Sequence, residues 1–404
     1  MTRRRATYLV FGQPRIEQAE IDEVVDTLRS SWIGTGPKAA EFERRFAAYC
    51  EAPSAVAVSS CTAAMHLCLL EVGAGPGTGV ITSPLTFPAG VNVILHTGAR
   101  PFLVDIDRRT MNLSPDRLRE FLERDCVRDA KTGRPRHSAS HEEIRAIIPV
   151  HFAGRPCDMD AIGALAAEYG LSVIEDAAHA IEARYHGRKV GSISPFTCFS
   201  FYATKNMTTG EGGMVTLTGT DAAAGLKIKT LHGISHDAWS RFEAEGAPSY
   251  EVVSPGYKYN MTDIQASIGL HQLARIENNL RRREEIWSRY DRELAGLPIG
   301  LPAPVDADTV HARHLYTVLV DPGRAGISRD ELRRRLHEAN IGTGVHFLAI
   351  HLHDYYRRKL GYEAADLPEA AYVSARTVSL PLSPYLTDAD VSDVTEATRR
   401  ALRP

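Results

Sequence analysis

Three polar segments of the chain could do chemistry together. Ser59–Thr62 (SSCT) lies between an expected strand and an expected helix, and Glu175-Asp176 ends another expected strand. In the run FSFYATKN, Lys205 follows a further apolar strand and precedes the Gly-rich turn at residues 210–213. Backbone N–H groups at a helix start, supported by hydroxyls, bind phosphate. A strand-end Asp can hold a protonated ring nitrogen, and a lysine can form a Schiff base.

Each of these segments also has an ordinary structural interpretation, as a helix cap, a turn cap or a surface charge. Together they match the needs of pyridoxal phosphate, which requires an amine for a Schiff base, an acid opposite the pyridine nitrogen and an anion site for its phosphate. A free lysine has a pKa near ~10.4, so its neutral form must be favoured locally or supplied through imine formation.

Two other motifs suggest different chemistry less well. The run GAGPGTG at residues 73–79 follows a helix and precedes a strand, whereas a dinucleotide-binding loop follows a strand and opens a helix, so we interpret it as a turn. Several histidines make a metal site conceivable: His232, His236, His346, His351 and His353. Because Gly233 weakens a helix at the first pair and no HExxH motif is present, we expect no metal.

The elements that must position these groups alternate along the chain. Seven strands are expected, namely AVAV from Ala55, GVIT from Gly79, RPFLVD from Arg100, IRAIIPV from Ile144, LSVIED from Leu171, FTCFSF from Phe196 and GGMVTL from Gly212. Helical patterns fill most gaps: CTAAMHLCLLEV, PAGVNVILHTG, SPDRLREFLER and DMDAIGALAAEYG. Strands alternating with helices predict an α/β fold with a mostly parallel sheet covered on both faces.

The remaining sequence predicts a second unit. Ser114 and Asp158 are suited to cap their helices, and the polar stretch from Asp129 to Glu143 is interpreted as a surface insertion. A long charged helical segment from Asp263 to Leu297 is expected to bridge two domains, because 404 residues exceed one comfortable core. We expect a large domain over residues 1–270 and a smaller α+β domain over 271–404.

Composition excludes several classes of protein. The net charge of -3, from 47 basic and 50 acidic residues, lacks the basic excess of a nucleic-acid binder. No stretch of about 18 apolar residues is present, so we expect no membrane span. The arginines at residues 3–5 are not followed by an apolar region, which argues against a targeting signal. Six scattered cysteines without a CxxC pair indicate reduced thiols in a cytoplasmic protein.

In its motifs the chain resembles the DegT/DnrJ/EryC1/StrS-type sugar aminotransferases, which are fold-type I pyridoxal-phosphate enzymes like aspartate aminotransferase. The resemblance covers nearly the whole chain. It rests on SSWIGTGPKAAEFERRFA, AVAVSSCTAAMHL, TSPLTFPAGVNVI, GARPFLVDID, IIPVHFAGRPCDMD, VIEDAAHAIEARYHGRKVGS, FSFYATKNMTTGEGGMV and GYKYNMTDIQASIGL. EDAAHA and GYKYNMTDIQ look most like the enzyme that makes UDP-4-amino-4-deoxyarabinose, which suggests chemistry at sugar C4.

The resemblance implies roles for three catalytic residues. Lys205 forms the Schiff base with the cofactor and then moves the proton. Asp176 pairs with the pyridinium nitrogen, and His179 sits near the phenolic oxygen of the cofactor.

It also implies five cofactor-binding residues. Phe87 stacks on the ring. Cys61, Thr62 and Ser200 contact the phosphate, and Lys258 reaches the phosphate of the neighbouring subunit, so the resemblance predicts a homodimer with shared active sites.

The chain departs from the family pattern at two residues and in the insertion from Asp129, which is unusual for the family. Cys61 stands where Gly or Ala is usual, so that only its backbone is expected to bind. Asn260 replaces a frequent Arg, which leaves substrate phosphate recognition open.

The reaction implied by the resemblance has two halves. Glutamate gives its amine to the cofactor, forming pyridoxamine phosphate, and a UDP- or dTDP-linked 4-keto sugar then receives it. Amination at sugar C3, or of a keto-cyclitol, remains an alternative. A related sugar dehydratase would carry His in place of Lys205, and a regulator would need a DNA-binding appendage that the sequence lacks.

Overall fold

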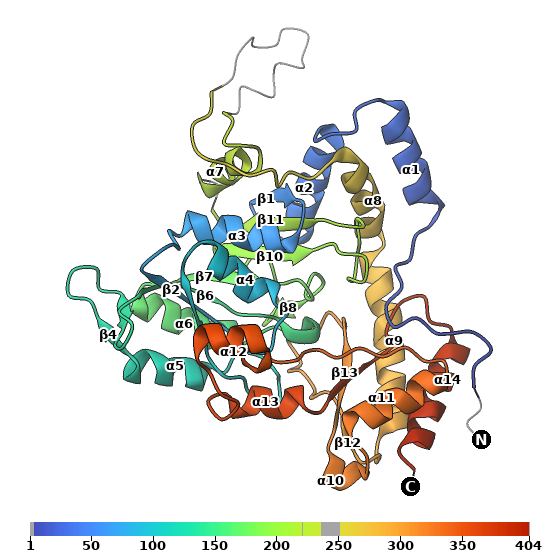
Figure 1. Cartoon of the computed structure of the whole chain (residues 1–404). Helices are drawn as coiled ribbons and strands as arrows, with labels where there is room; N and C mark the ends of the chain where they lie inside the picture. Colours follow the sequence, from blue (N-terminus) through green and yellow to red (C-terminus); the bar gives the residue numbers. More distant parts are fainter. Residues whose placement is uncertain (1–3, 220, 236–250, 404) are drawn as a thin grey trace.

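The computed structural model describes residues 4–219, 221–235 and 251–403. Its large sheet has the strand order β1-β11-β10-β7-β6-β2-β3 (Figure 1). The strands are β1 (Ser54–Val58), β2 (Thr78–Thr82), β3 (Arg100–Leu103), β6 (Glu143–Ile148), β7 (Ser172–Asp176), β10 (Phe196–Ser200) and β11 (Gly213–Leu217). All seven expected strands form, and the predicted α/β fold is confirmed.

Of these seven strands, one runs against the others. β10, β7, β6, β2 and β3 pair in parallel, whereas β11 is antiparallel to both β10 and β1. β11 reverses because the segment of residues 201–212 returns the chain directly beside the strand it has just left. As a result, the carboxyl ends of β1, β2, β6, β7 and β10 meet at one edge.

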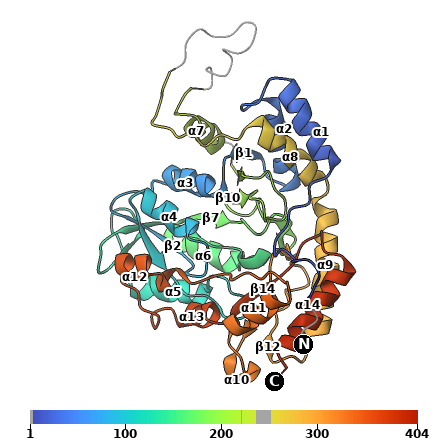
Figure 2. The same cartoon turned by 45° about the vertical axis from the view of Figure 1, so that its right-hand side comes forward.

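Helices cover both faces of the sheet, as expected (Figures 1 and 2). On one face α3 (Cys61–Glu71) and α4 (Ala89–His96) pack against alternate strand residues, including Val56, Val80 and Ile174. The other face carries α2 (Pro37–Tyr49), α5 (Pro115–Arg124), α6 (Met159–Tyr169) and α8 (Asp263–Ala274). The predicted caps form, since the side chains of Ser114 and Asp158 accept hydrogen bonds from backbone N–H groups of their own helices.

The expected insertion is an ordered hairpin. β4 (Cys126–Arg128) and β5 (Pro135–His137) pair with each other, and β5 contacts the large sheet through Arg136 and Glu143. Asp129 Oδ1 accepts hydrogen bonds from the N–H groups of Lys131 and Thr132, at 2.8 and 3.1 Å, which fixes the turn. The hairpin projects from the side of the molecule (Figure 1).

The long helical segment is divided into two helices. α8 ends at Ala274, and α9 (Ile276–Leu294) begins after Arg275, whose φ of -114° and ψ of 9° depart from helical geometry. The Arg275 guanidinium bonds to the carbonyl of Arg15 and to Glu20 of α1 (Gln18–Arg29). The break lets α8 pack against α1 and α2 while α9 packs into the C-terminal unit.

The C-terminal unit is α+β, as expected. β12 (Ile299–Gly300), β13 (Tyr316–Val320) and β14 (Thr377–Leu380) form an antiparallel sheet, against which α9, α11 (Arg329–Glu338) and α14 (Asp388–Ala401) pack. The remaining elements are α7 (Asp221–Thr230), α10 (Pro322–Ala325), α12 (Asp354–Leu360), α13 (Pro368–Ser374) and the small hairpin β8 (Arg184–Tyr185) and β9 (Arg188–Lys189). No helix of the described residues is long and apolar enough to cross a membrane.

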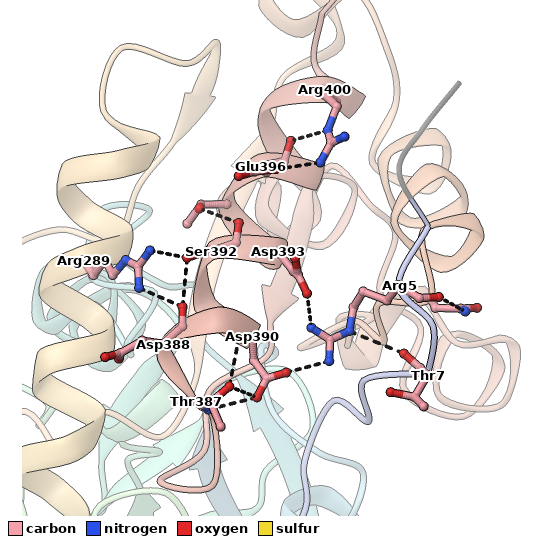
Figure 3. A network of polar contacts seen from close by, with 12 residues as sticks. Arg5, Thr7, Arg289, Thr387, Asp388, Asp390, Ser392, Asp393, Glu396 and Arg400 are labelled. Carbon is pink, nitrogen blue, oxygen red and sulfur yellow. Dashed lines mark hydrogen bonds and ion pairs between the residues drawn. The ribbon is translucent and has the colours of Figure 1, made fainter.

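Residues 5–9 lie on this C-terminal unit. The N–H of Leu9 donates to the carbonyl of Asn340 at 2.8 Å. The Arg5 guanidinium binds Asp390 of α14 at 2.6 Å and also binds Asp393, as Figure 3 shows. Arg5 and α14 therefore bind each other, although Asp390 lies 385 residues from Arg5 in the sequence. The division of the chain at residues 270 and 271 stays a prediction.

Candidate active site

The phosphate cradle forms where β1 leads into α3. Ser60 is extended, and its Oγ accepts a hydrogen bond from the Ala63 N–H at 3.1 Å. The N–H groups of Cys61 and Thr62 belong to the first helical turn, where no intrahelical acceptor exists. Gly213 lies opposite this loop, and a Cβ there would come within 2.4 Å of the Ser60 carbonyl carbon. Only glycine lets the sheet approach the loop so closely, and the helix start is left able to bind an anion.

A cavity of about 600 Å³ opens over the same edge of the sheet. It is lined by seven of the eight site residues that the sequence predicts: Cys61, Thr62, Phe87, Asp176, His179, Ser200 and Lys205. They come from the ends of β1, β7 and β10 and from the segment that follows β2. The size is that of an ordinary small-molecule site.

Lys258 lies outside the lining of this cavity. Its side chain is exposed, and its backbone pairs with that of Leu231. The fold therefore does not bring Lys258 into the cavity of its own chain, and its role at the phosphate of a neighbouring subunit stays a prediction.

The two adjacent acids at the end of β7 have different surroundings. Glu175 is fully buried; its Oε1 accepts hydrogen bonds from the Ser194 N–H and the Thr197 hydroxyl, and its Oε2 lies 2.7 Å from His151 Nε2. Both carboxylate oxygens of Glu175 therefore have partners within the protein, and Glu175 serves the structure of the fold.

Asp176 faces the cavity instead. Its Oδ1 accepts a hydrogen bond from the Ala178 N–H at 3.1 Å and lies 3.9 Å from Cys61 Sγ. Burial raises the pKa of Asp176, while this backbone hydrogen bond and the positive charge of Lys205 oppose the rise. A cation held opposite the carboxylate would stabilise its ionised form.

Lys205 lies in the tight connection between β10 and β11. Its N–H donates to the Tyr202 carbonyl at 2.9 Å, which forms the turn. Within the part of the chain that the structure describes, the Lys205 amine makes no hydrogen bond. Burial lowers the pKa of Lys205, opposed by Asp176 and Cys61. A buried amine with a lowered pKa can act as a nucleophile and as a base.

His179 presents a hydrogen-bond donor to the cavity. Its Nδ1 accepts from the Ala153 N–H at 3.2 Å, so the proton of the neutral ring is on Nε2. Burial, followed by the charge of Lys205, holds the pKa of His179 well below its usual value. The ring is therefore neutral at pH 7.

Comparison with known proteins decides the family. The model of the DegT/DnrJ/EryC1/StrS aminotransferase family matches residues 14–399. The chain belongs to this family.

The relatives of this aminotransferase include sugar enzymes of known structure. The spore coat polysaccharide biosynthesis protein SpsC of Bacillus subtilis is 47% identical over 401 residues, covering 99% of this chain and 98% of SpsC. The putative sugar aminotransferase Spr1654 of Streptococcus pneumoniae, solved in a PLP form, is 35% identical with a TM-score of 0.85 over 98% of both chains. DesV of S. venezuelae, solved with a ketimine intermediate, is 31% identical with a TM-score of 0.82, covering 95% of this chain and 94% of DesV.

This aminotransferase uses pyridoxal phosphate, and its cavity fits that cofactor. Spr1654 has been crystallised in both PLP and PMP forms. In the present chain the helix start offers N–H donors for the phosphate, and Asp176 and Lys205 lie in the same cavity. Phe87 is 64% exposed, with its ring centroid 6.4 Å from that of Phe347. An aromatic ring this exposed at a cavity wall suits stacking on a cofactor ring.

Several lining residues of this aminotransferase escaped the sequence analysis. Among them are Phe11, Tyr202, His314 and Phe347, and His346 had been considered only for metal binding.

Burial lowers the pKa of His346 to about 4. Within the described residues, no group of three or more His, Cys, Asp or Glu side chains could hold a metal ion, and His236 lies outside those residues. The sequence signal for His314 is its place two residues before the apolar strand β13.

Proposed function

We propose that this sugar aminotransferase transfers the amine of glutamate to a nucleotide-linked keto sugar, with UDP- or dTDP-linked 4-keto sugars as the favoured substrates. The observation that carries the proposal is the single cavity in which Lys205, Asp176 and the α3 cradle meet. The name of SpsC, which refers to polysaccharide biosynthesis, supports a sugar substrate. The family resemblance of the EDAAHA and GYKYNMTDIQ segments supports position C4 of the sugar.

Bound pyridoxal phosphate supplies an electron sink for the carbanion that forms when the substrate carbon loses its proton. Lys205 takes that proton with its amine, which burial keeps from being permanently charged. The same amine returns the proton to the neighbouring carbon, so one residue serves as base and then as acid.

The other side chains hold charge and orientation. The Asp176 carboxylate would keep a proton on the ring nitrogen of the bound cofactor, because a buried anion stabilises an adjacent cation. The Nε2–H of His179 would donate to the phenolic oxygen of the bound cofactor. The α3 N-terminus binds the phosphate together with the hydroxyls of Thr62 and Ser200, and Phe87 packs on the ring face.

The site is completed by a second copy of the chain in this proposal. Lys258 is exposed and lies outside the cavity lining of its own chain. In a two-fold dimer each chain gives its Lys258 to the phosphate of the other, since an isologous contact is reciprocal. We place this homodimer in the cytoplasm, where its six buried cysteines stay reduced.

The test is a panel of UDP- and dTDP-linked 3-keto and 4-keto sugars and keto-cyclitols, with glutamate as donor and mass spectrometry as readout. We expect amination of a nucleotide-linked 4-keto sugar and formation of 2-oxoglutarate in equal amounts. Reaction of keto-cyclitols alone would refute the nucleotide-sugar proposal, and reaction of 3-keto sugars alone would move the amination to C3.

A further inference from the structure

A second histidine lies against His179 at the cavity wall. The ring centroids of His179 and His314 are 4.4 Å apart with a tilt of 38°, so the rings overlap and do not share an in-plane hydrogen bond. Both side chains are buried and both line the cavity. Neither the family motifs nor the sequence analysis gives His314 a role.

Hydrogen bonds fix the protonation of His314. The amide nitrogen of Asn206 donates to Glu182 Oε2 at 2.7 Å and to the Ala312 carbonyl at 2.9 Å, which uses both of its protons. The Asn206 Oδ1 is therefore an acceptor, and it lies 2.8 Å from His314 Nδ1. His314 Nδ1 must donate to it, so the neutral ring carries its lone pair on Nε2.

The two histidines thus present opposite groups. His179 is bonded at Nδ1 as an acceptor and offers an Nε2–H, whereas His314 is bonded at Nδ1 as a donor and offers a lone pair. In the described part of the chain, Nε2 of His314 has no protein partner. A free acceptor at the wall of a ligand cavity can accept a hydrogen bond from a group that takes part in the reaction.

The backbone that holds the pair is strained on both sides. Ala153 and Arg313 have φ values of 57° and 49°, in the left-handed region that residues with a Cβ avoid. The backbone N–H of Ala153 donates to the His179 ring, and the Ala153 carbonyl accepts a hydrogen bond from the backbone N–H of His314 at 3.0 Å. Strained residues persist where the surrounding structure requires a particular placement, here that of two imidazole rings.

Lys205 lies close enough to His314 for its positive charge to lower the pKa of the His314 ring. Lys205 directly precedes Asn206, the hydrogen-bond partner of His314. Lys205, Asn206 and His314 also line a second, small cavity of about 30 Å³, whereas His179 and His346 do not. Other charged groups also affect the pKa values of Lys205 and His314. Asp176 and Cys61 raise the pKa of Lys205. His346, Arg283 and His311 lower the pKa of His314.

We propose that His314 is a positioning residue whose Nε2 accepts a hydrogen bond from the Lys205 amine and holds that amine over the substrate carbon. The proposal rests on Lys205 being the reacting amine. His314 stays neutral throughout and exchanges no proton. An acceptor beside an ammonium stabilises its charged form, so His314 raises the pKa of Lys205 against the effect of burial.

Two substitutions separate this role from a structural one. His314→Asn places an amide nitrogen near the Nδ1 position, keeps the bond to Asn206 and removes the Nε2 acceptor. His314→Gln places an amide oxygen near the Nε2 position and gives up the bond to Asn206. His314→Asn therefore loses only the Nε2 acceptor, and His314→Gln loses only the Nδ1 donor.

The readout is the titration of the Lys205 amine itself. We would reconstitute the enzyme with pyridoxamine phosphate, which leaves the Lys205 amine free, and label it with trace acetic anhydride across a range of pH. Mass spectrometry of the Lys205 peptide then gives the midpoint. In His314→Asn the midpoint should fall by about one pH unit, and kcat by ~10-fold with KM unchanged. In His314→Gln the midpoint should stay near that of the wild type, while the melting temperature falls.

The proposal is overturned if the labelling midpoint of Lys205 is normal in His314→Asn, or if it shifts more in His314→Gln than in His314→Asn. Either result would mean that His314 serves the structure alone. A normal melting temperature in His314→Asn confirms that the variant folds. Borohydride labelling of the wild type tests the role of Lys205 separately from the role of His314. If the cofactor is fixed to another lysine, the role of Lys205 fails. If it is fixed to Lys205 while the His314→Asn midpoint is unmoved, only the role of His314 fails.

Discussion

The carboxyl edge of the large sheet and the C-terminal unit treat polar side chains differently. Around strand β13 of the C-terminal unit, polar side chains bond to one another: Tyr316 donates to Asp291 at 2.7 Å, and Thr317 Oγ1 lies 3.1 Å from Ser379 Oγ. At the edge of the large sheet, the Lys205 amine and the Nε2 atoms of His179 and His314 have no hydrogen-bond partner within the described chain. All three residues line the cavity, so these atoms are available to a bound ligand.

The same contrast holds for Lys189, which is buried, and Lys205, which is half-buried at the cavity wall. Burial lowers the pKa of both Lys205 and Lys189. The Lys189 amine donates to the Glu182 carbonyl at 3.1 Å and lies 4.0 Å from the centre of the Tyr49 ring. Lys189 is therefore satisfied by the protein, whereas Lys205 is left free to react.

Lys205→Ala should have the largest effect. Removing the amine that moves the proton should slow transamination by ~1000-fold or more, within the range of general acid–base catalysis. The phosphate cradle should still retain the cofactor. Single-turnover absorbance changes with glutamate give the rate. The matched control is Lys189→Met, which should lower stability and leave turnover near normal; the reverse pattern would contradict the comparison of the two lysines.

Asp176→Asn should have the next largest effect. It removes the charge that holds the ring proton while nearly preserving shape, and we expect a loss of at least ~100-fold in kcat. Glu175→Gln is the neighbouring control, since Glu175 bonds only within the protein. It should cost about 1–3 kcal/mol of stability and little activity. Near-normal turnover of Asp176→Asn would show that Asp176 serves structure, like its neighbour.

Lys258 sharpens the comparison, because its proposed partner lies in another chain. Lys258→Ala should cost ~1.5–3 kcal/mol of phosphate binding. Mixing Lys205→Ala chains with Lys258→Ala chains under reshuffling conditions should restore roughly a quarter of wild-type activity, because half the dimers are mixed and each has one intact site. If activity does not return on mixing, Lys258 acts within its own chain, and a fully active Lys258→Ala would refute the role altogether.

Arg5→Ala should have the smallest effect and should change stability alone. Arg5 and Asp390 are largely buried and lie 2.6 Å apart, so we expect a loss of about 1 kcal/mol with unchanged turnover. Burial raises the pKa of Asp390, but hydrogen bonds from Thr387 and Arg5 outweigh it and lower the pKa overall. The wild-type advantage should therefore be present at neutral pH and disappear as the pH falls through the lowered pKa. Urea unfolding at several pH values measures it, and a pH-independent difference would exclude the ion pair as its cause.

The sequence predicted the sheet and most of the site for a local reason. Apolar β-branched runs mark the strands, and the groups that bind cofactor stand directly after those runs, so parallel pairing brings Asp176 and Lys205 together. His314 could not be found this way. Its partner Asn206 lies 108 residues away, and only the folded chain shows which ring nitrogen is used. The contact of Arg5 with α14, 385 residues away at Asp390, is hidden for the same reason.

The central claim, that Lys205 is the amine left free for the cofactor, is tested most directly by borohydride reduction of the purified enzyme loaded with pyridoxal phosphate. Reduction should fix the cofactor to a single peptide, and mass spectrometry should place it on Lys205. The Lys205→Ala protein should retain cofactor before reduction and release it on denaturation afterwards. Fixation to Lys189 or to any other lysine would contradict the account.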